Sequence, residues 1–135
     1  MIHLDTSFMV DLLRERASSR EGPATGLLTG PLGGEELAIS VHVACELHAG
    51  AELADRPSQE RGRVQALCAA LQVRFPDQAF APLYGRLLAD LRRAGHSISA
   101  MDLLIAVAAL VDESPLVTRN VKDFQRVPGL ELVGY

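Results

Sequence analysis

The regular alternation of short apolar runs with longer segments of helical spacing constrains the fold of this chain more than any other feature. The apolar runs have the length of β-strands and cover residues 2–4, 37–41, 71–75, 115–118 and 130–133. Strands that are separated by helices pair in parallel, because each helix carries the chain back to the edge from which the strand began. The alternation therefore predicts an α/β fold: a three-layer sandwich with a central, mainly parallel sheet of about five strands.

The intervening segments show helix signals of their own. Thr6 or Ser7 can cap a helix after the first strand, and Ser99 can cap a nearly all-apolar helix that runs to residue 111. Further helices are expected over about 42–54, from 57 to about 71, and over about 83–94. Glycine-containing stretches at 22–23 and 30–34 bracket a short helical or irregular segment.

Length and composition limit the class of protein. The 135 residues fit one domain, residues 1–135, and the net charge of −4 argues against a chain that coats nucleic acid or an anionic membrane through bulk charge. The longest apolar run, 103–111, is shorter than the roughly 20 residues that span a bilayer. No basic segment precedes an apolar run at the start, and Cys45 and Cys68 lack metal-ligand spacing. We expect a soluble cytoplasmic protein whose cysteines are small core residues.

Asp5 is the first candidate functional residue. It directly follows the first apolar run, and open parallel sheets bind ligands beyond the carboxyl ends of their strands. The structural alternative is that Asp5 caps the next helix. Because Thr6 and Ser7 can do so unaided, the sequence favours a functional role for Asp5.

Asp102 is the only charged residue between Ser97 and Val111. An unpaired carboxylate in such an apolar helix costs several kcal/mol, so it needs a partner, a helix terminus or a metal ion. The spacing from Ser99 to Asp102 also matches a capping box, in which serine and acid satisfy the first turn. The two interpretations remain equally favoured.

Two further sites carry acids in similar settings. Glu46 is a lone acid in an apolar segment, where a surface pair with His42 is the structural alternative. Asn120 and Asp123 follow the fourth apolar run, where a solvated turn is the alternative. Three basic residues accompany them: Arg119, Lys122 and Arg126.

Taken together, the acids form a pattern that suggests a metal site. Asp5, Glu46, Asp102 and Asp123 come from four separate segments and carry as much negative charge as the net charge of −4. Clustered carboxylates repel one another and are tolerated mainly where a cation neutralises them. Ligands with oxygen donors alone select Mg²⁺ or Mn²⁺ over zinc.

These residues resemble the PIN-domain ribonucleases, and among them the VapC-type toxins of bacterial toxin–antitoxin pairs. The resemblance covers essentially the whole chain. It is carried by the segments Ile2-His3-Leu4-Asp5-Thr6-Ser7, Ala38-Ile39-Ser40 with Cys45-Glu46-Leu47 and Gly50, Ser99-Ala100-Met101-Asp102-Leu103-Leu104-Ile105-Ala106, Leu116-Val117-Thr118-Arg119-Asn120-Val121-Lys122-Asp123-Phe124 and Pro128-Gly129-Leu130.

The resemblance implies which residues form the site. Asp5, Glu46 and Asp102 would line it, with Asp5 and Asp102 as the usual metal ligands. A fourth member would come from Asn120 or Asp123, and we expect both near the site with Asn120 closer to the ion. Five residues are weaker candidates for substrate contact: Thr6, Ser7, Arg119, Lys122 and Arg126.

The resemblance also implies an activity: hydrolysis of RNA phosphodiester bonds by a Mg²⁺- or Mn²⁺-dependent endoribonuclease that uses water as the nucleophile. The implied partners are the RNA substrate, a small antitoxin and a second copy of the chain, with no membrane. The RNA target is not identified by any motif.

Two other classes compete with this interpretation. One is a catalytically silent PIN-like module that serves only for binding. The other is a receiver or phosphatase-like phosphotransfer domain, which also places an aspartate after a parallel strand. Ser7 stands where such a phosphatase needs a second aspartate, and the acidic pair Glu35-Glu36 is misplaced for a receiver.

Overall fold

A computed structural model describes all residues from 1 to 135. Its centre is a single five-stranded sheet with the strand order β3-β2-β1-β4-β5, and every neighbouring pair is parallel. The strands are β1 (Ile2–Leu4), β2 (Leu37–Ser40), β3 (Gln72–Arg74), β4 (Leu116–Val117) and β5 (Leu132–Val133). The predicted parallel sheet of five strands is confirmed.

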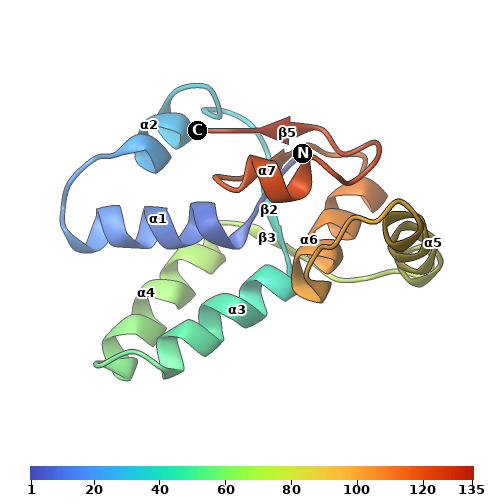
Figure 1. Cartoon of the computed structure of the whole chain (residues 1–135). Coiled ribbons are helices and arrows are strands. Elements are labelled where there is room, and N and C mark those ends of the chain that lie inside the picture. The colour runs from blue at the N-terminus through green and yellow to red at the C-terminus, as the bar shows by residue number, and fades with distance from the viewer.

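Seven helices cover the sheet. They are α1 (Thr6–Ala17), α2 (Pro23–Thr29), α3 (Val41–Glu52), α4 (Pro57–Ala69), α5 (Phe80–Arg93), α6 (Ala100–Val111) and α7 (Val121–Phe124). Figure 1 shows α1 and α2 on one side of the strands and α5 and α6 on the other, as in the predicted three-layer sandwich. The short helix α7 was not predicted, since its four residues give no periodicity. No helix combines the length and the apolar character that crossing a membrane requires.

The order of the strands reverses at one place in the sheet. From β1 the chain adds β2 and β3 on one side, and it then returns to add β4 and β5 on the other. In sheets of this kind the crevice at the reversal, beyond the carboxyl ends of the strands, is where ligands bind. Leu4 pairs with Val117, so Asp5 and Thr118 leave the sheet side by side at this point.

The apolar character of α6 follows from its place in the core. Leu103, Ile105 and Ala106 are at most 1% exposed, and they pack in one cluster with Phe8 and Leu12 of α1. The burial of these apolar side chains holds α6 against the sheet. Asp102, in the first turn of α6, therefore lies next to the apolar core, from which water is excluded.

The cap of α1 differs from the prediction. Asp5, and not Thr6 or Ser7, caps this helix, and its Oδ1 accepts the N–H of Phe8 at 2.9 Å. The reason is positional: Asp5 keeps an extended backbone (φ −86°, ψ 175°), while Thr6 and Ser7 already lie in the first turn.

The expectation for the cysteines was wrong at one position. Cys45 is exposed and Cys68 is half-buried, and neither forms a disulfide. Helix α3 buries Val43, Ala44 and Leu47. Cys45 lies on the opposite face of this amphipathic helix, which leaves its thiol at the surface.

Candidate active site

Asp5 is a buried carboxylate held by three donors. Its Oδ1 accepts the hydroxyl of Ser7 at 2.7 Å in addition to the N–H of Phe8, and its Oδ2 accepts the hydroxyl of Thr118. Burial raises the pKa of Asp5, while these three hydrogen bonds and the positive charge of Arg119 oppose the rise. Because Oδ2 accepts only one hydrogen bond, it keeps a lone pair for a further ligand.

Thr118 is a site residue that the sequence reasoning did not single out. It is fully buried at the end of β4, donates to Asp5, and accepts the backbone N–H of Asn120 at 2.9 Å. In the sequence, Thr118 is marked only as a small hydroxyl residue at the end of a predicted strand. That signal becomes specific only when β1 and β4 are known to be neighbours, because Thr118 and Asp5 are 113 residues apart.

Glu46 lies in the second turn of α3, a helix capped by Ser40 at the end of β2. The hydroxyl of Thr6 donates to its Oε1 at 2.5 Å. The alternative of a His42–Glu46 surface pair is not formed, since His42 stacks on Phe80 with 5.4 Å between the ring centres. One carboxylate oxygen of Glu46 is thus fixed by Thr6.

Asp102 lies at the third position of α6. Its backbone N–H donates to the hydroxyl of Ser99 at 3.1 Å, which is one of the two hydrogen bonds of the expected capping box. Burial raises the pKa of Asp102, and the negative charges of Glu46, Asp123 and Asp5 raise it further against the opposing effect of Ser99. These charges act on Asp102 because the fold brings the four acids to one place.

The segment after β4 forms the other wall of the site. Asp123, on the first turn of α7, shares a hollow of about 410 Å³ with Asp102 and Arg126. The guanidinium of Arg126 donates to the carbonyl oxygen of Ser97 at 2.9 Å. The side chain of Asn120 is exposed. Its backbone N–H donates to Thr118, and its carbonyl oxygen accepts the N–H groups of Asp123 and Phe124.

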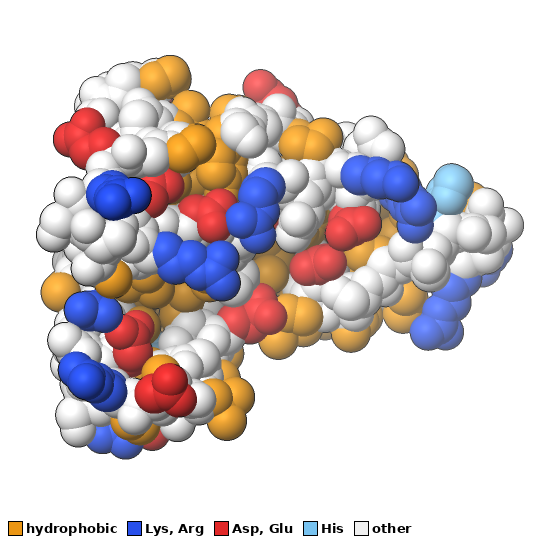
Figure 2. Space-filling view, turned by 60° about the vertical axis from the view of Figure 1, so that its left-hand side comes forward, with side chains coloured by type: hydrophobic (Ala, Val, Ile, Leu, Met, Phe, Trp, Pro, Cys, Tyr) orange, Lys and Arg blue, Asp and Glu red, His pale blue; other side chains and the backbone are white.

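The basic candidates have different surroundings. Lys122 is exposed and makes no ion pair, whereas the side chain of Arg119 pairs with Asp11. Figure 2 shows acidic side chains across the middle of one face, interspersed with Lys and Arg side chains. This face therefore offers both negative charge for a cation and positive charge for phosphates.

The donor set suits a hydrated hard cation better than an all-protein metal cage. No group of three His, Cys, Asp or Glu side chains is close enough together to hold one ion. Mg²⁺ is usually bound through one or two carboxylates while it keeps several waters. Two carboxylates of this cluster, Asp5 and Asp102, have raised pKa values, mainly because burial opposes their charge.

A family model described as PIN domain matches residues 2–130. The chain belongs to the PIN-domain family. Within the PIN-domain proteins it is similar to Ribonuclease VapC19 of Mycobacterium tuberculosis, with 32% identity over 130 residues, 95% of each chain. It is also similar to Ribonuclease VapC2 of Rickettsia felis, with 32% identity over 96 residues, 71% of this chain and 72% of that protein.

Solved structures of PIN-domain complexes have the same fold. VapBC2 from Rickettsia felis, bound to a DNA fragment from its promoter, gives a TM-score of 0.90 at 27% identity over 100% of this chain and 99% of the other. DNA-bound VapBC from Salmonella typhimurium gives 0.87 at 26% identity over 99% and 98%. The resemblance drawn from the sequence is confirmed. Divalent-metal dependence is general among PIN-domain VapC nucleases.

The strand order argues against the receiver form of the phosphotransfer alternative. Receiver domains have the flavodoxin-like order 2-1-3-4-5, whereas this sheet has 3-2-1-4-5. The aspartate after β1 is therefore not the phosphorylated aspartate of a receiver.

Proposed function

We propose that this chain is a divalent-metal-dependent endoribonuclease of the VapC toxin type, which hydrolyses RNA phosphodiester bonds. The observation that carries the proposal is the convergence of Asp5, Glu46, Asp102 and Asp123 at the reversal point of the sheet. Relatives that match this chain along 95% of its length are named ribonucleases. A silent binding module is less favoured, because it would gain nothing from four carboxylates that repel one another.

Asp5 and Asp102 are the proposed ligands of Mg²⁺ or Mn²⁺, with Asn120 and Asp123 as further members of the site. Burial raises the pKa of both carboxylates, and the neighbouring acids raise that of Asp102 further, so a bound cation would favour the charged form of both. When bound, such an ion supplies Lewis-acid stabilisation of the phosphate and lowers the pKa of an attacking water molecule.

The protein's own residues orient this chemistry. The hydroxyl of Thr6 fixes Oε1 of Glu46 and leaves Oε2 to accept the proton of the attacking water. Ser7 and Thr118 fix the orientation of the Asp5 carboxylate, so it does not reorganise when substrate binds. Because water attacks rather than the ribose 2′-hydroxyl, the proposed products carry 5′-phosphate and 3′-hydroxyl ends.

The proposal includes partners. Relatives of this chain were solved as toxin–antitoxin complexes, some of them with DNA. We propose that a small VapB-like antitoxin also inhibits this chain, through a guanidinium that competes with metal for the carboxylates of Asp5 and Asp102. We further propose that the protein acts in the cytoplasm as a homodimer.

The test incubates the purified protein with defined transfer, ribosomal and messenger RNAs, in Mg²⁺ and in excess chelator. Cleavage is expected in Mg²⁺ and not in chelator, and Asp102→Asn is expected to lower the rate by about a hundredfold or more. Asp90→Asn, an exposed acid paired with Arg93 on α5, is the matched control and should cleave like the wild type. Cleavage that survives both chelator and Asp102→Asn would overturn the proposed metal mechanism.

A further inference from the structure

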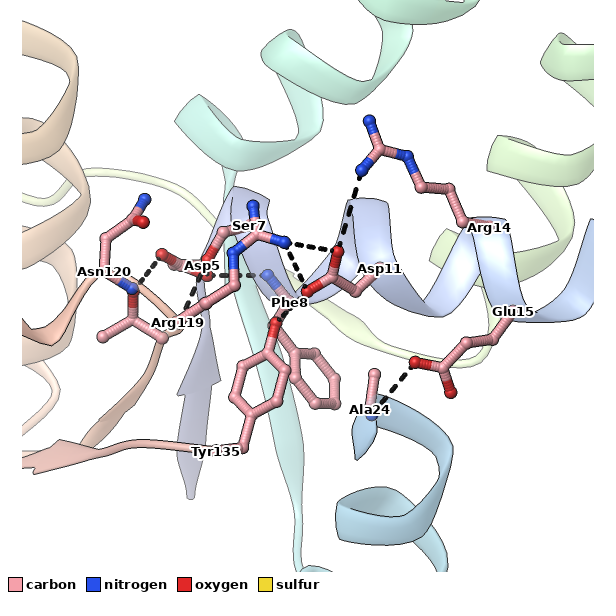
Figure 3. Close-up of polar contacts among 11 residues, drawn as sticks. Asp5, Ser7, Phe8, Asp11, Arg14, Glu15, Ala24, Arg119, Asn120 and Tyr135 are labelled. Atoms are coloured by element: carbon pink, nitrogen blue, oxygen red, sulfur yellow. Dashed lines mark hydrogen bonds and ion pairs between the residues drawn. The ribbon is translucent and has the colours of Figure 1, made fainter. Parts of the chain in front are cut away.

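The guanidinium of Arg119 is held in a fixed place next to the acidic site. Its Nη1 donates to both carboxylate oxygens of Asp11, at 2.8 and 3.0 Å. Figure 3 shows the Arg119 side chain reaching across the start of α1 from Asp5 toward Asp11. The Asp11 side chain is only 14% exposed, whereas that of Arg119 is 51% exposed, so a mostly buried anchor holds an accessible cation.

Tyr135 in turn anchors Asp11. Its hydroxyl donates to Oδ2 of Asp11 at 2.7 Å, and its ring packs edge-on against Phe8 with 5.3 Å between the centres. Burial raises the pKa of Tyr135, and the charge of Asp11 raises it further, so the hydroxyl stays protonated and remains a donor. Residue 135, which follows β5, thereby fixes a side chain on α1.

The remaining donors of Arg119 are free. Only Nη1 has a protein partner, which leaves the Nε–Nη2 edge of the guanidinium without one. This edge presents two parallel N–H groups that match two oxygens of a phosphate. A hollow of about 350 Å³ borders the guanidinium, and Arg14 on its rim lies 4.0 Å from Asp11.

Two acids line this hollow: Asp11, which pairs with Arg119, and Glu15, which has partners of its own. Glu15 accepts the backbone N–H groups of Gly22 and Thr25 at 2.8 Å and that of Ala24 at 3.1 Å. These hydrogen bonds lower the pKa of Glu15, so it keeps its charge, which is stabilised at the N-terminus of α2.

Arg119 is also connected to the candidate catalytic centre through the backbone. Its N–H donates to the hydroxyl of Ser7 at 3.2 Å, and that hydroxyl donates to Asp5. Arg119 and the carboxylate of Asp5 thus lie on either side of one short segment at the start of α1.

From this geometry we propose a phosphate subsite: Arg119 binds, through its Nε–Nη2 edge, an RNA phosphate that flanks the scissile one, and Asp11 and Tyr135 are positioning residues that hold Arg119 for it. The subsite rests on the proposed ribonuclease function and deepens it. Tyr135 contributes to substrate binding only indirectly, through Asp11.

The first test measures steady-state cleavage of a short single-stranded RNA. Arg119→Gln is expected to raise KM about tenfold with kcat within about twofold of wild type, because a flanking phosphate is bound equally in the ground and transition states. Its binding, measured without Mg²⁺, should depend less on salt, with the slope of log K against log salt lower by about 0.7. Arg92→Gln, on the exposed face of α5, is the matched control and should change neither quantity.

The second test separates positioning from a structural role. Tyr135→Phe keeps the ring against Phe8 and removes one hydrogen bond, so KM should rise about threefold while the melting temperature falls by no more than about 5 °C. In the Arg119→Gln background the same substitution should have no further effect on KM, because the residue through which Tyr135 acts is gone.

The outcomes distinguish the two proposals. If wild-type protein does not cleave RNA in Mg²⁺, the proposed function fails and the subsite fails with it. If wild-type protein cleaves, an unchanged KM and salt slope in Arg119→Gln overturns the subsite alone. A fall in kcat without a rise in KM would also overturn it, because Arg119 would then act on the scissile phosphate. Additive effects in the double variant would overturn the positioning role of Tyr135.

Discussion

The carboxylate of Asp102 lies in surroundings that oppose its charge. Burial at the start of α6 and the nearby charges of Glu46, Asp123 and Asp5 all raise its pKa above the ordinary value of 3.8. Between 3.8 and the raised value, the folded protein binds more protons than the unfolded chain. Its stability without metal therefore falls as pH rises through that window. The carboxylate that the proposed chemistry needs is one that costs stability at neutral pH.

Asp102→Asn should consequently separate stability from activity. In metal-free buffer at pH 7 we expect its melting temperature to equal that of the wild type or to exceed it by up to about 4 °C, because the amide carries no charge to repel its neighbours. Thermal unfolding followed by circular dichroism measures this, with Asp90→Asn as the control for a lost surface charge. A marked drop in melting temperature would mean that the Asp102 carboxylate is a structural cap.

The sequence identified some site residues and missed others for a physical reason. Asp5 and Asp102 are charges in apolar segments, and such a charge stands out in the sequence without knowledge of its neighbours. Thr118, Asp11 and Tyr135 have partners more than a hundred positions away, so their roles appear only when the strands are assembled.

At the scale of elements, the side chain of Glu15 on α1 holds the N-terminus of α2. Burial works against the ionisation of Glu15, but hydrogen bonds from Thr25, Ala24 and Gly22 outweigh it and lower its pKa. The stabilisation is therefore present above the ordinary value of 4.5 and is lost as pH falls through the lowered value. Helix α2 has no side-chain cap of its own, so Glu15 replaces one.

Glu15→Gln is expected to lower the free energy of unfolding by about 1 kcal/mol, since one charged acceptor for three N–H groups is lost. Chemical denaturation at pH 7 measures the change, and the difference from wild type should shrink below about pH 4. Glu21→Gln, an exposed neighbour without a partner, should leave stability unchanged. Equal losses in the two variants would contradict the capping role of Glu15, while cleavage of RNA should be unaffected in both.

Elements with strong local signals were predicted well, and short elements were not. Helix α6 was predicted with its Ser99 cap because apolar spacing and a capping serine agree. Helix α7 has a single turn and no side-chain cap, and its buried residue Phe124 reveals its role only through tertiary packing. The start of α5 at Phe80 rather than near residue 83 has the same cause, since no capping hydrogen bond marks it.

At the scale of the molecule, the place of the site follows from the strand order. Alternating elements predict a parallel sheet, but the order β3-β2-β1-β4-β5 depends on which distant strands pair, and local pattern carries no such information. The order decides that the residues after β1 and β4 meet. The net charge of −4 is also explained by the assembled molecule. It suggested general repulsion of RNA, but four acids that the fold brings together account for the whole value.

The measurement that tests the central claim most directly is the chemistry of the cleaved ends. Wild-type protein would cut a defined RNA in Mg²⁺ prepared in heavy-oxygen water, and the fragments would be analysed by mass spectrometry. Attack by water predicts 3′-hydroxyl ends and 5′-phosphates that carry the heavy oxygen, and it predicts equal cleavage when the nucleotide before the scissile bond lacks its 2′-hydroxyl. A 2′,3′-cyclic phosphate, or loss of cleavage on removal of that hydroxyl, would contradict the proposed mechanism.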